Sequence, residues 1–228
     1  MNKITILIPV FNEVNTLKDI LNKVENIDFY GLEKEIILID DYSTDGTKEL
    51  YKELNYKVLY HDKNMGKGAA LRTGFKEASG DIITIQDADL EYNPQDLLPL
   101  VKVLIDGEAD VVYGSRFLNI DKSKNFMLTH FLGNKMLTVI TNILYGAKLT
   151  DMETCYKVFK AEYVKNINIK SNRFDFEPEI TAKILKQGAK LKEVPITYNA
   201  RTFAEGKKIS WKDGFAAICA LMKFRFFD

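Results

Sequence analysis

The stretch IQDADLE at residues 85–91 ends an apolar run and sets Asp87 and Asp89 two positions apart. Side chains alternate in direction along an extended chain, so in a strand the two carboxylates would point the same way. Mg²⁺ and Mn²⁺ prefer oxygen ligands, and Mg²⁺ is commonly held by one or two carboxylates together with substrate phosphates. The stretch therefore predicts a site for a metal and a diphosphate or, taken alone, an ordinary polar turn.

Two earlier apolar runs also lead into polar loops. Residues 4–8 run into the loop 9–13, residues 35–39 run into the loop 40–45, and apolar residues at helical spacing follow each loop. This alternation continues over about half of the chain and predicts a parallel sheet with helices on its faces. Ligands of such sheets bind at the carboxyl ends of the strands. We therefore expect these two loops to form one site with residues 87–91.

The sequence NMGKGAALR at residues 64–72 predicts a glycine-rich helix start. Free backbone amides at a helix N-terminus favour an anion. The Gly-Lys pair at residues 66–67 does not indicate a phosphate-binding P-loop, because that motif needs an earlier glycine and a Ser or Thr after the lysine. The first strand is not followed by the G-x-G-x-x-G fingerprint of dinucleotide-binding folds either.

Composition agrees with one enzyme-sized domain. The 228 residues are 46% apolar, with 32 basic and 32 acidic side chains and no Pro/Gly/Ser-rich linker, which predicts a single domain over residues 1–228. The zero net charge argues against broad nucleic-acid binding. Cys155 and Cys219 are expected to be small apolar fillers, so neither a disulfide framework nor a zinc site is predicted. The N-terminal residues do not resemble a signal peptide, which predicts a cytoplasmic location.

These motifs, in this order, resemble the family-2 glycosyltransferases, inverting GT-A enzymes that use nucleotide-activated sugars. The match covers nearly the whole chain, and the stretches 40–47, 64–72 and 87–91 look most like those of dolichol-phosphate mannose synthases and polyprenyl-phosphate hexosyltransferases. The resemblance implies an α/β, Rossmann-like fold with a mostly parallel central sheet flanked by helices and with amphipathic C-terminal helices. It also implies a nucleotide-sugar-binding half at residues 1–115 and an acceptor-binding half at residues 116–228.

The resemblance further implies how a GDP- or UDP-activated hexose would be bound. Mg²⁺ or Mn²⁺ would be held by Asp87, Asp89 and Glu91. The residues implied for contact with the nucleotide sugar are Pro9, Phe11, Glu13, Asp40, Asp41, Lys67, Asp87, Ala88 and Asp89. Judged from the residues alone, Asp40 or Asp41 could instead cap the next helix.

The residues that the resemblance implies for catalysis are Asp89, Arg116, Asp151, Arg201 and Lys208. Arg116 matches an arginine that contacts the acceptor phosphate, for which a guanidinium fork is well suited, and a structural salt bridge is the alternative. Arg201 and Lys208 resemble a phosphate-binding loop in which Lys207 is an alternative contact. A solvated basic loop is the other interpretation of that segment.

Two acceptor classes stay open. A polyprenyl or dolichyl phosphate has a second pKa near 6, so its attacking oxygen is largely anionic and needs no strong base. A saccharide hydroxyl would need a positioned carboxylate, for which Asp151 and Glu153 in the stretch TDMETCYK, residues 150–157, are candidates. Glu177 and Glu179 are expected to begin a helix, where carboxylates complement the helix dipole.

Two stretches, residues 126–145 and 210–227, have apolar side chains at helical spacing with polar interruptions, so we expect amphipathic helices that do not span a membrane. Such stripes usually face a core, whereas the resemblance favours a membrane interface for the first. The resulting hypothesis is a metal-dependent hexosyltransferase that acts on polyprenyl or dolichyl phosphate, peripherally at the cytosolic membrane face. The alternatives are a saccharide acceptor in surface-polysaccharide assembly and a non-catalytic nucleotide-sugar-binding protein.

Overall fold

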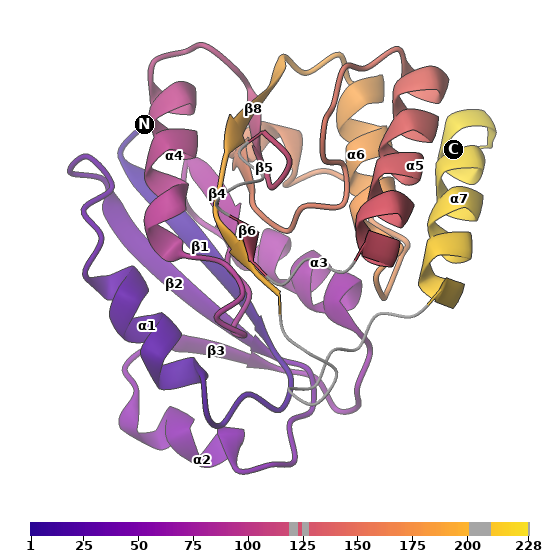
Figure 1. Cartoon of the computed structure of the whole chain (residues 1–228). Coiled ribbons are helices and arrows are strands. Elements are labelled where there is room, and N and C mark those ends of the chain that lie inside the picture. The colour runs from indigo at the N-terminus through magenta and orange to yellow at the C-terminus, as the bar shows by residue number, and fades with distance from the viewer. Residues whose placement is uncertain (119–122, 125–127, 201–210, 228) are drawn as a thin grey trace.

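The computed structural model describes residues 1–118, 123–124, 128–200 and 211–227. A seven-stranded sheet flanked by helices forms the body of the molecule (Figure 1). Its strands are β1 (Lys3–Val10), β2 (Glu33–Asp40), β3 (Lys57–Tyr60), β4 (Ile82–Ile85), β5 (Val111–Ser115), β7 (Lys157–Lys160) and β8 (Leu191–Pro195). The helices are α1 (Leu17–Glu25), α2 (Thr47–Leu50), α3 (Lys67–Glu77), α4 (Leu97–Ile105), α5 (Leu128–Tyr145), α6 (Phe176–Lys186) and α7 (Trp211–Phe226). Short 3-10 helices η1 (Tyr51–Glu53), η2 (Pro94–Asp96) and η4 (Ala161–Tyr163) and a small second sheet of β6 (Ser123–Lys124) and β9 (Tyr198–Asn199) complete the description.

The order of the large sheet is β3-β2-β1-β4-β7-β5-β8. Strands β1 to β4 are parallel, with β1 paired to β2 on one side and to β4 on the other. Strand β7 runs antiparallel to both β4 and β5, and β8 is parallel to β5. The predicted mostly parallel sheet is therefore confirmed, with β7 as the reversed strand.

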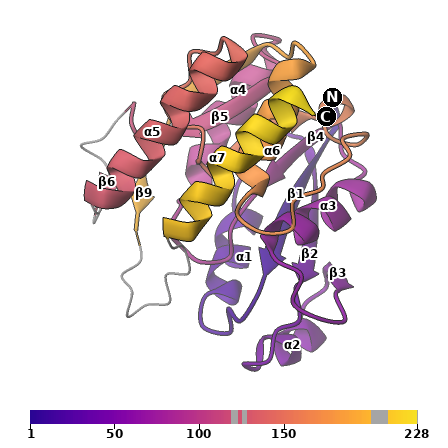
Figure 2. The same cartoon turned by 90° about the vertical axis from the view of Figure 1, so that its right-hand side faces the viewer.

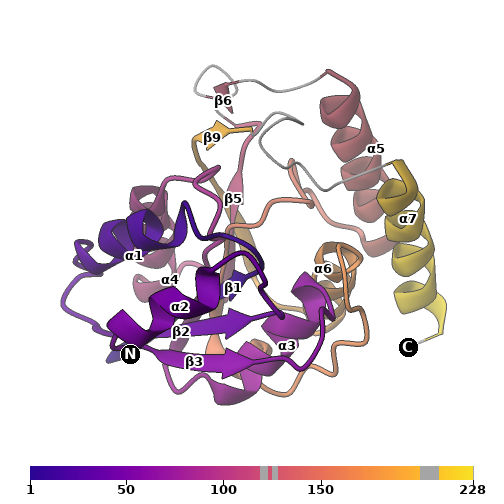
Figure 3. The same cartoon turned by 90° about the horizontal axis from the view of Figure 1, so that it is seen from below.

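Both faces of the sheet are covered by helices. Successive side chains of β1 point to opposite faces and so pack into two separate hydrophobic cores. Ile4, Ile6 and Ile8 pack with residues of α1 and α4 on one face, and Leu7 packs with residues of α3 and α6 on the other. Figure 3 shows α1 and α4 on one side of the sheet and α3 and α6 on the other. A strand buried on both faces needs an apolar residue at nearly every position, which explains the continuous apolar runs in the sequence.

Helix α3 lies close to the sheet because its inner face is made of small residues. A Cβ atom at Gly74 would lie 3.0 Å from side-chain atoms of Leu7 and Ile39, and Ala70 is fully buried. This close approach brings the first residue of α3, Lys67, to the carboxyl ends of the parallel strands.

Helices α5 and α7 lie side by side, outside the layer that contains α6 (Figure 2). Phe224 and Ala220 of α7 are buried against Ala182 of α6, and the hydroxyl of Tyr145 in α5 donates to the carbonyl of Leu221 at 2.7 Å. Both predicted C-terminal helices are thus present, although residues 126, 127 and 210 of the predicted stretches lie outside the described residues. Within the described part of the chain, no helix has the length and apolar character needed to cross a membrane.

Candidate active site

The loops that follow β1, β2 and β4 start at one edge of the sheet. The loop after β1 is tied to the loop after β2, because the Asn12 N–H donates to Ser43 Oγ at 3.0 Å and the Thr44 N–H donates to Asn12 Oδ1 at 2.8 Å. Each of the three loops holds one residue in the left-handed backbone region: Asn12 (φ 57°), Tyr42 (φ 70°) and Leu90 (φ 62°). Such conformations cost energy in residues other than glycine and cluster at functional sites.

The paired carboxylates at the end of β2 are both buried and engaged inside the protein. Asp40 accepts the hydroxyl of Tyr51 at 2.7 Å and a backbone N–H of the following loop at 2.9 Å. Asp41 accepts the backbone N–H groups of residues 65 and 66 at 2.8 and 2.7 Å, and its Oδ1 lies 2.7 Å from Nδ1 of His61. The two carboxylates therefore shape the loops next to the β1 loop, where Pro9, Phe11 and Glu13 are half-buried. Direct contact of these residues with a nucleotide stays a prediction.

Lys67 joins the start of α3 to the end of β4. Its Nζ lies 2.7 Å from Asp87 Oδ1, 3.1 Å from Cys155 Sγ and 3.8 Å from Glu177 Oε1. Burial alone would lower the pKa of Lys67 and raise that of Asp87, but their mutual attraction outweighs burial, so the pKa of Lys67 is raised and that of Asp87 is lowered. Both groups are therefore charged. Burial and the neighbouring Asp87 raise the pKa of the Cys155 thiol, which stays protonated.

The glycines around Lys67 are required by close packing. A Cβ atom at Gly66 would lie 2.4 Å from the carbonyl oxygen of Asn172, and one at Gly68 would lie 2.6 Å from that of Ser171. The Ala69 N–H donates to the same Asn172 carbonyl at 3.1 Å, so one amide of this helix start is already used inside the protein. The glycine-rich start that the sequence associates with an anion thus also serves as the contact for residues 171–173.

A second buried cation lies behind this pair. Lys157 is fully buried, forms an ion pair with Glu177 and donates to the carbonyl of Met152 at 3.3 Å. Three side-chain atoms of the described residues are buried without a hydrogen-bond partner: Oε1 of Glu153, Oγ1 of Thr154 and Oε1 of Glu177. Burial, reinforced by the nearby carboxylate of Glu177, raises the pKa of Glu153 to about 8. At neutral pH the carboxyl group of Glu153 therefore carries a proton.

In the DADLE turn, residues 87–91, the carboxylates of Asp89 and Glu91 accept hydrogen bonds from different parts of the protein. Oδ1 of Asp89 accepts the Glu91 N–H at 3.1 Å, and Oε2 of Glu91 accepts the hydroxyl of Tyr198 at 2.9 Å, while Ala88 is buried between the two aspartates. Within the described residues, no three His, Cys, Asp or Glu side chains converge on one point as a complete metal site would require. Mg²⁺ that binds substrate phosphates needs only one or two protein carboxylates. The residues present therefore fit a metal that binds together with a diphosphate.

Arg116 and Asp151 form a two-point ion pair. Arg116 Nε and Nη2 each lie 2.7 Å from a different oxygen of Asp151, whose Oδ2 also accepts the Arg116 backbone N–H at 3.0 Å. Burial would lower the pKa of Arg116, but the Asp151 carboxylate outweighs burial and raises it. Glu193 fixes this segment by accepting the backbone N–H of Thr150 at 2.7 Å and that of Asp151 at 3.0 Å. The salt bridge that the sequence left open as an alternative for Arg116 is present.

Two predicted site residues, Arg201 and Lys208, lie outside the described residues, as does Lys207. The expectation that both cysteines are small apolar fillers is wrong for Cys219, which is exposed. Cys155 is partly buried and packs against the hydrophobic core, and its Sγ also lies 3.1 Å from Lys67 Nζ. Sequence reasoning missed Tyr198, which belongs to no motif. Its contact with Glu91 spans 107 positions, so no local pattern could have indicated it.

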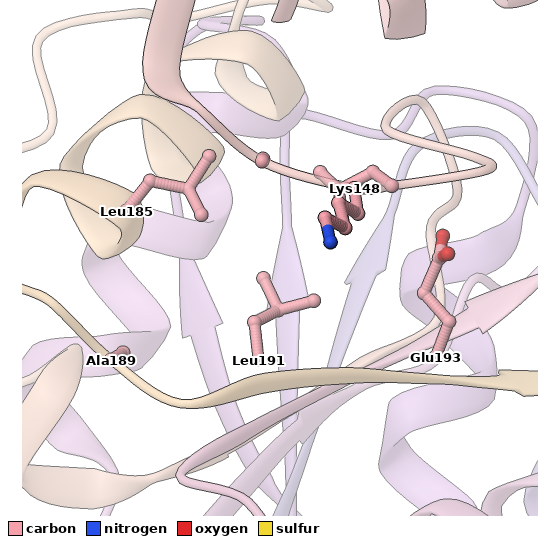
Figure 4. A pocket seen from close by; sticks show the side chains of 7 residues that line it. Lys148, Leu185, Ala189, Leu191 and Glu193 are labelled. Atoms are coloured by element: carbon pink, nitrogen blue, oxygen red, sulfur yellow. The ribbon is translucent and has the colours of Figure 1, made fainter. Parts of the chain in front are cut away.

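A cavity of about 230 Å³ lies elsewhere, between the C-terminal ends of α5 and α6 and strand β8 (Figure 4). Its lining residues are Ala147, Lys148, Leu149, Leu185, Ala189, Leu191 and Glu193. None of the predicted site residues that the structure describes lines it. The candidate active site is therefore the edge of the sheet described above.

Comparisons with known proteins agree with this geometry. The profile of the family described as "Glycosyl transferase family 2" matches residues 5–167. Dolichol-phosphate mannosyltransferase of Pyrococcus furiosus is 31% identical over 90% of this chain, which spans 59% of that protein's length. UDP-N-acetylglucosamine--dolichyl-phosphate N-acetylglucosaminyltransferase of Methanococcus voltae is 30% identical, with 90% of each chain covered.

The solved structure of glucosyl-3-phosphoglycerate synthase from Mycobacterium tuberculosis superposes with a TM-score of 0.77. The superposition covers all of this chain and 80% of the synthase chain, and the two sequences are 18% identical. At this identity the likeness concerns the fold, and it confirms the GT-A, Rossmann-like architecture. Because the family profile covers most of the chain and a relative at 30% identity is covered over nine-tenths of its length, the chain belongs to glycosyl transferase family 2 and is a glycosyltransferase.

Proposed function

We propose that this enzyme transfers a hexose from a nucleotide sugar to a polyprenyl phosphate at the cytosolic face of a membrane, with inversion and with Mg²⁺ or Mn²⁺. Two relatives are named for transfer to dolichol phosphate or dolichyl phosphate, and fold neighbours were solved with UDP and Mn²⁺ or Mg²⁺, which supports both substrates and the metal. In this proposal residues 1–115 bind the donor and residues 116–228 bind the acceptor.

On the donor side, the charges at the end of β4 suit a nucleoside diphosphate leaving group. Asp87, Asp89 and Glu91 would hold the metal, with Asp87 sharing its carboxylate between the metal and Lys67. The metal would supply stabilisation for the negative charge that develops when the sugar–phosphate bond breaks. Lys67, held 2.7 Å from Asp87, would add a fixed positive charge at the same place.

On the acceptor side, the hydrogen bonds already made by the Asp151 carboxylate favour an anionic acceptor. Its carboxylate accepts three N–H groups of Arg116, so it is poorly placed to take a proton from a hydroxyl. A phosphate monoester needs no such base, because its second pKa lies near 6. The guanidinium of Arg116 would bind that phosphate while Asp151 holds its orientation.

The observation that carries the choice of a lipid is a set of exposed apolar side chains on α5 and α7, two helices that lie side by side (Figure 2). Side chains on the outer sides of these helices are large, apolar and exposed, with Ile143 at 76% and Phe215 at 67%. Clustered exposed apolar residues mark interaction surfaces, and helices with aromatic and basic residues bind membrane interfaces. The outer apolar face consists of Leu132, Met136, Val139, Ile143, Phe215, Met222 and Phe226.

This apolar face begins next to the acceptor residues. Lys135 of α5 donates to the carbonyl of Thr150 at 3.4 Å, and its Nζ lies 4.5 Å from the ring centre of Phe117, the residue after Arg116. A lipid held at this face would therefore have its phosphate within reach of Arg116.

The test is release of nucleoside diphosphate from a panel of GDP- and UDP-hexoses, with Mg²⁺ or Mn²⁺, with and without a polyprenyl phosphate. We expect release that depends on the lipid and is lost in Asp89→Asn. If a saccharide stimulates release and the lipid does not, the acceptor is a saccharide and not a polyprenyl phosphate. If no donor gives release, the proposed transfer reaction is wrong.

Membrane binding is tested separately by sedimentation with vesicles of anionic phospholipid. Val139→Asp combined with Ile143→Asp should abolish cosedimentation, because both side chains lie on the outer apolar face. Ile105→Asp is the matched control, since Ile105 is exposed at the end of α4, away from α5 and α7 (Figure 1). Equal binding by the double variant and the control would contradict membrane attachment through this face.

One observation favours the second candidate, transfer to a saccharide hydroxyl. Glu153 has a pKa of about 8, and a general base works best when its pKa is near the operating pH. With a hydroxyl acceptor, Glu153→Gln should reduce kcat about a hundredfold or more. With a phosphate acceptor, the same variant should change kcat only a few-fold.

A further inference from the structure

Tyr198 lies where the donor and acceptor sides of the site meet. It is the first residue of β9 and is only 9% exposed. Its hydroxyl donates to Oε2 of Glu91 at 2.9 Å, and the N–H of the next residue, Asn199, donates to the carbonyl of Glu91 at 2.9 Å. Two hydrogen bonds from β9 thus fix both the side chain and the backbone of Glu91.

The ring of Tyr198 faces the acceptor side. The guanidinium carbon of Arg116 lies 5.2 Å from the centre of this ring, a distance at which a cation is attracted to an aromatic face. The ring of Tyr92 packs beside it at 5.1 Å between centres, and Tyr156 packs on Tyr92 at 4.7 Å. The position of the Tyr198 ring is therefore fixed by neighbours, and its face borders the Arg116 guanidinium, which Asp151 also holds.

We propose that Tyr198 is a positioning residue that orients Glu91 toward the metal through its hydroxyl and Arg116 toward the acceptor phosphate through its ring. This inference rests on the proposed function, in which Glu91 is a metal ligand and Arg116 binds phosphate. Tyrosine suits both tasks because its polar and aromatic parts act in different directions. A phenylalanine would fill the same space and face Arg116 but could not orient Glu91.

The chemistry of the hydroxyl agrees with a donor role. A tyrosine hydroxyl ordinarily has a pKa near 10, so it keeps its proton at neutral pH and can donate to Glu91. Groups that hydrogen-bond to metal ligands typically change metal affinity 10- to 100-fold when they are removed. Loss of the Tyr198 hydroxyl should therefore be detectable in metal binding without any turnover.

The first experiment measures Mn²⁺ binding by electron paramagnetic resonance in the presence of UDP or GDP. Tyr198→Phe should weaken Mn²⁺ binding roughly tenfold. Tyr145→Phe is the matched control, because it also removes a hydroxyl that donates to an internal acceptor, at 2.7 Å, but between α5 and α7. We expect the control to bind Mn²⁺ as the unmodified protein does.

A double-mutant cycle tests whether the hydroxyl acts through Glu91. In a Glu91→Gln background the further change Tyr198→Phe should have little additional effect on Mn²⁺ binding, since the carboxylate that it orients is gone. A second comparison isolates the ring: Tyr198→Leu should raise the KM for the acceptor phosphate several-fold, whereas Tyr198→Phe should leave this KM nearly unchanged.

The outcomes separate this inference from the proposed function. If the unmodified protein binds Mn²⁺ with nucleotide and transfers hexose, but Tyr198→Phe binds Mn²⁺ normally or weakens binding equally in the Glu91→Gln background, the positioning role is wrong and the proposed function stands. If the unmodified protein neither binds Mn²⁺ with nucleotide nor transfers hexose, both are wrong.

Discussion

The donor and acceptor sides of the site hold their buried carboxylates by different means. On the donor side, Asp40 and Asp41 mostly accept hydrogen bonds from backbone amides, a hydroxyl and an imidazole of neighbouring loops. On the acceptor side, Asp151 pairs with the guanidinium of Arg116, and Glu177 pairs with the ammonium of the fully buried Lys157. Asp40 and Asp41 are thus held mainly by hydrogen bonds, whereas Asp151 and Glu177 are held by ion pairs. On the donor side, Asp87 is the carboxylate held by an ion pair, with Lys67.

This difference has an energetic consequence. Removing one hydrogen bond to a carboxylate costs about 1–3 kcal/mol, whereas removing one partner of a buried ion pair costs about 3–5 kcal/mol because the other charge stays buried. Stability around Asp151 and Glu177 therefore depends on charge balance, which makes these two positions more sensitive to conservative substitutions than Asp40 and Asp41.

The largest expected effect on stability is that of replacing a buried aspartate by asparagine on the acceptor side, and the same replacement on the donor side serves for comparison. Asp151→Asn should reduce the free energy of unfolding by about 3–5 kcal/mol, because it leaves the buried Arg116 guanidinium without its carboxylate. Asp40→Asn, the matched variant on the donor side, should cost about 1–3 kcal/mol. Urea unfolding of both variants measures the difference, and an equal loss would contradict the contrast between ion pairs and hydrogen bonds.

A somewhat smaller effect should follow from a methyl group at the start of α3. In Gly68→Ala the new Cβ would lie 2.6 Å from the Ser171 carbonyl, so the helix start or residues 171–173 must shift. Overpacking of this kind costs about 1–3 kcal/mol. Gly133→Ala in α5 is the control, since no described atom beyond its own stretch of helix lies within 4 Å of the added Cβ, and it should gain up to about 1 kcal/mol from helix propensity. Thermal unfolding of both variants gives the sign, and a stabilised Gly68→Ala would refute the packing explanation.

The donor side could be predicted from sequence because each of its parts is local. Strand runs, polar loops and the DADLE stretch each occupy a few consecutive residues, and the rule that ligands bind at carboxyl ends of parallel strands brings the loops together. The ion pairs could not be predicted in this way. Lys67 and Asp87 are 20 positions apart, and the reversed strand β7, which sets the place of Lys157, carried no sequence signal for its direction.

Helices α5 and α7 illustrate a second limit. Their apolar stripes at helical spacing were compatible with a core or with an interface, because both sides of each helix are apolar. The structure buries Leu137 of α5 and Leu221 of α7 and exposes Met136 and Met222 next to them in sequence. Which stripe faces inward depends on how α7 packs on α6, which is a property of the tertiary structure and not of the periodicity.

The pH dependence of stability tests the charge balance on the acceptor side. The pKa of Glu153 is raised from 4.5 to about 8, so between these values the folded protein keeps a proton that the unfolded chain releases. The free energy of unfolding should therefore fall as pH rises from about 5 to 8, by at most about 1.4 kcal/mol per pH unit. Glu153→Gln is neutral at all these pH values and should remove this slope. Its stability should match that of the unmodified protein near pH 5 and exceed it at pH 8 in urea unfolding. Parallel stability curves for the two proteins would show that Glu153 is ionised in the fold, and the acceptor side would then carry an unbalanced buried charge.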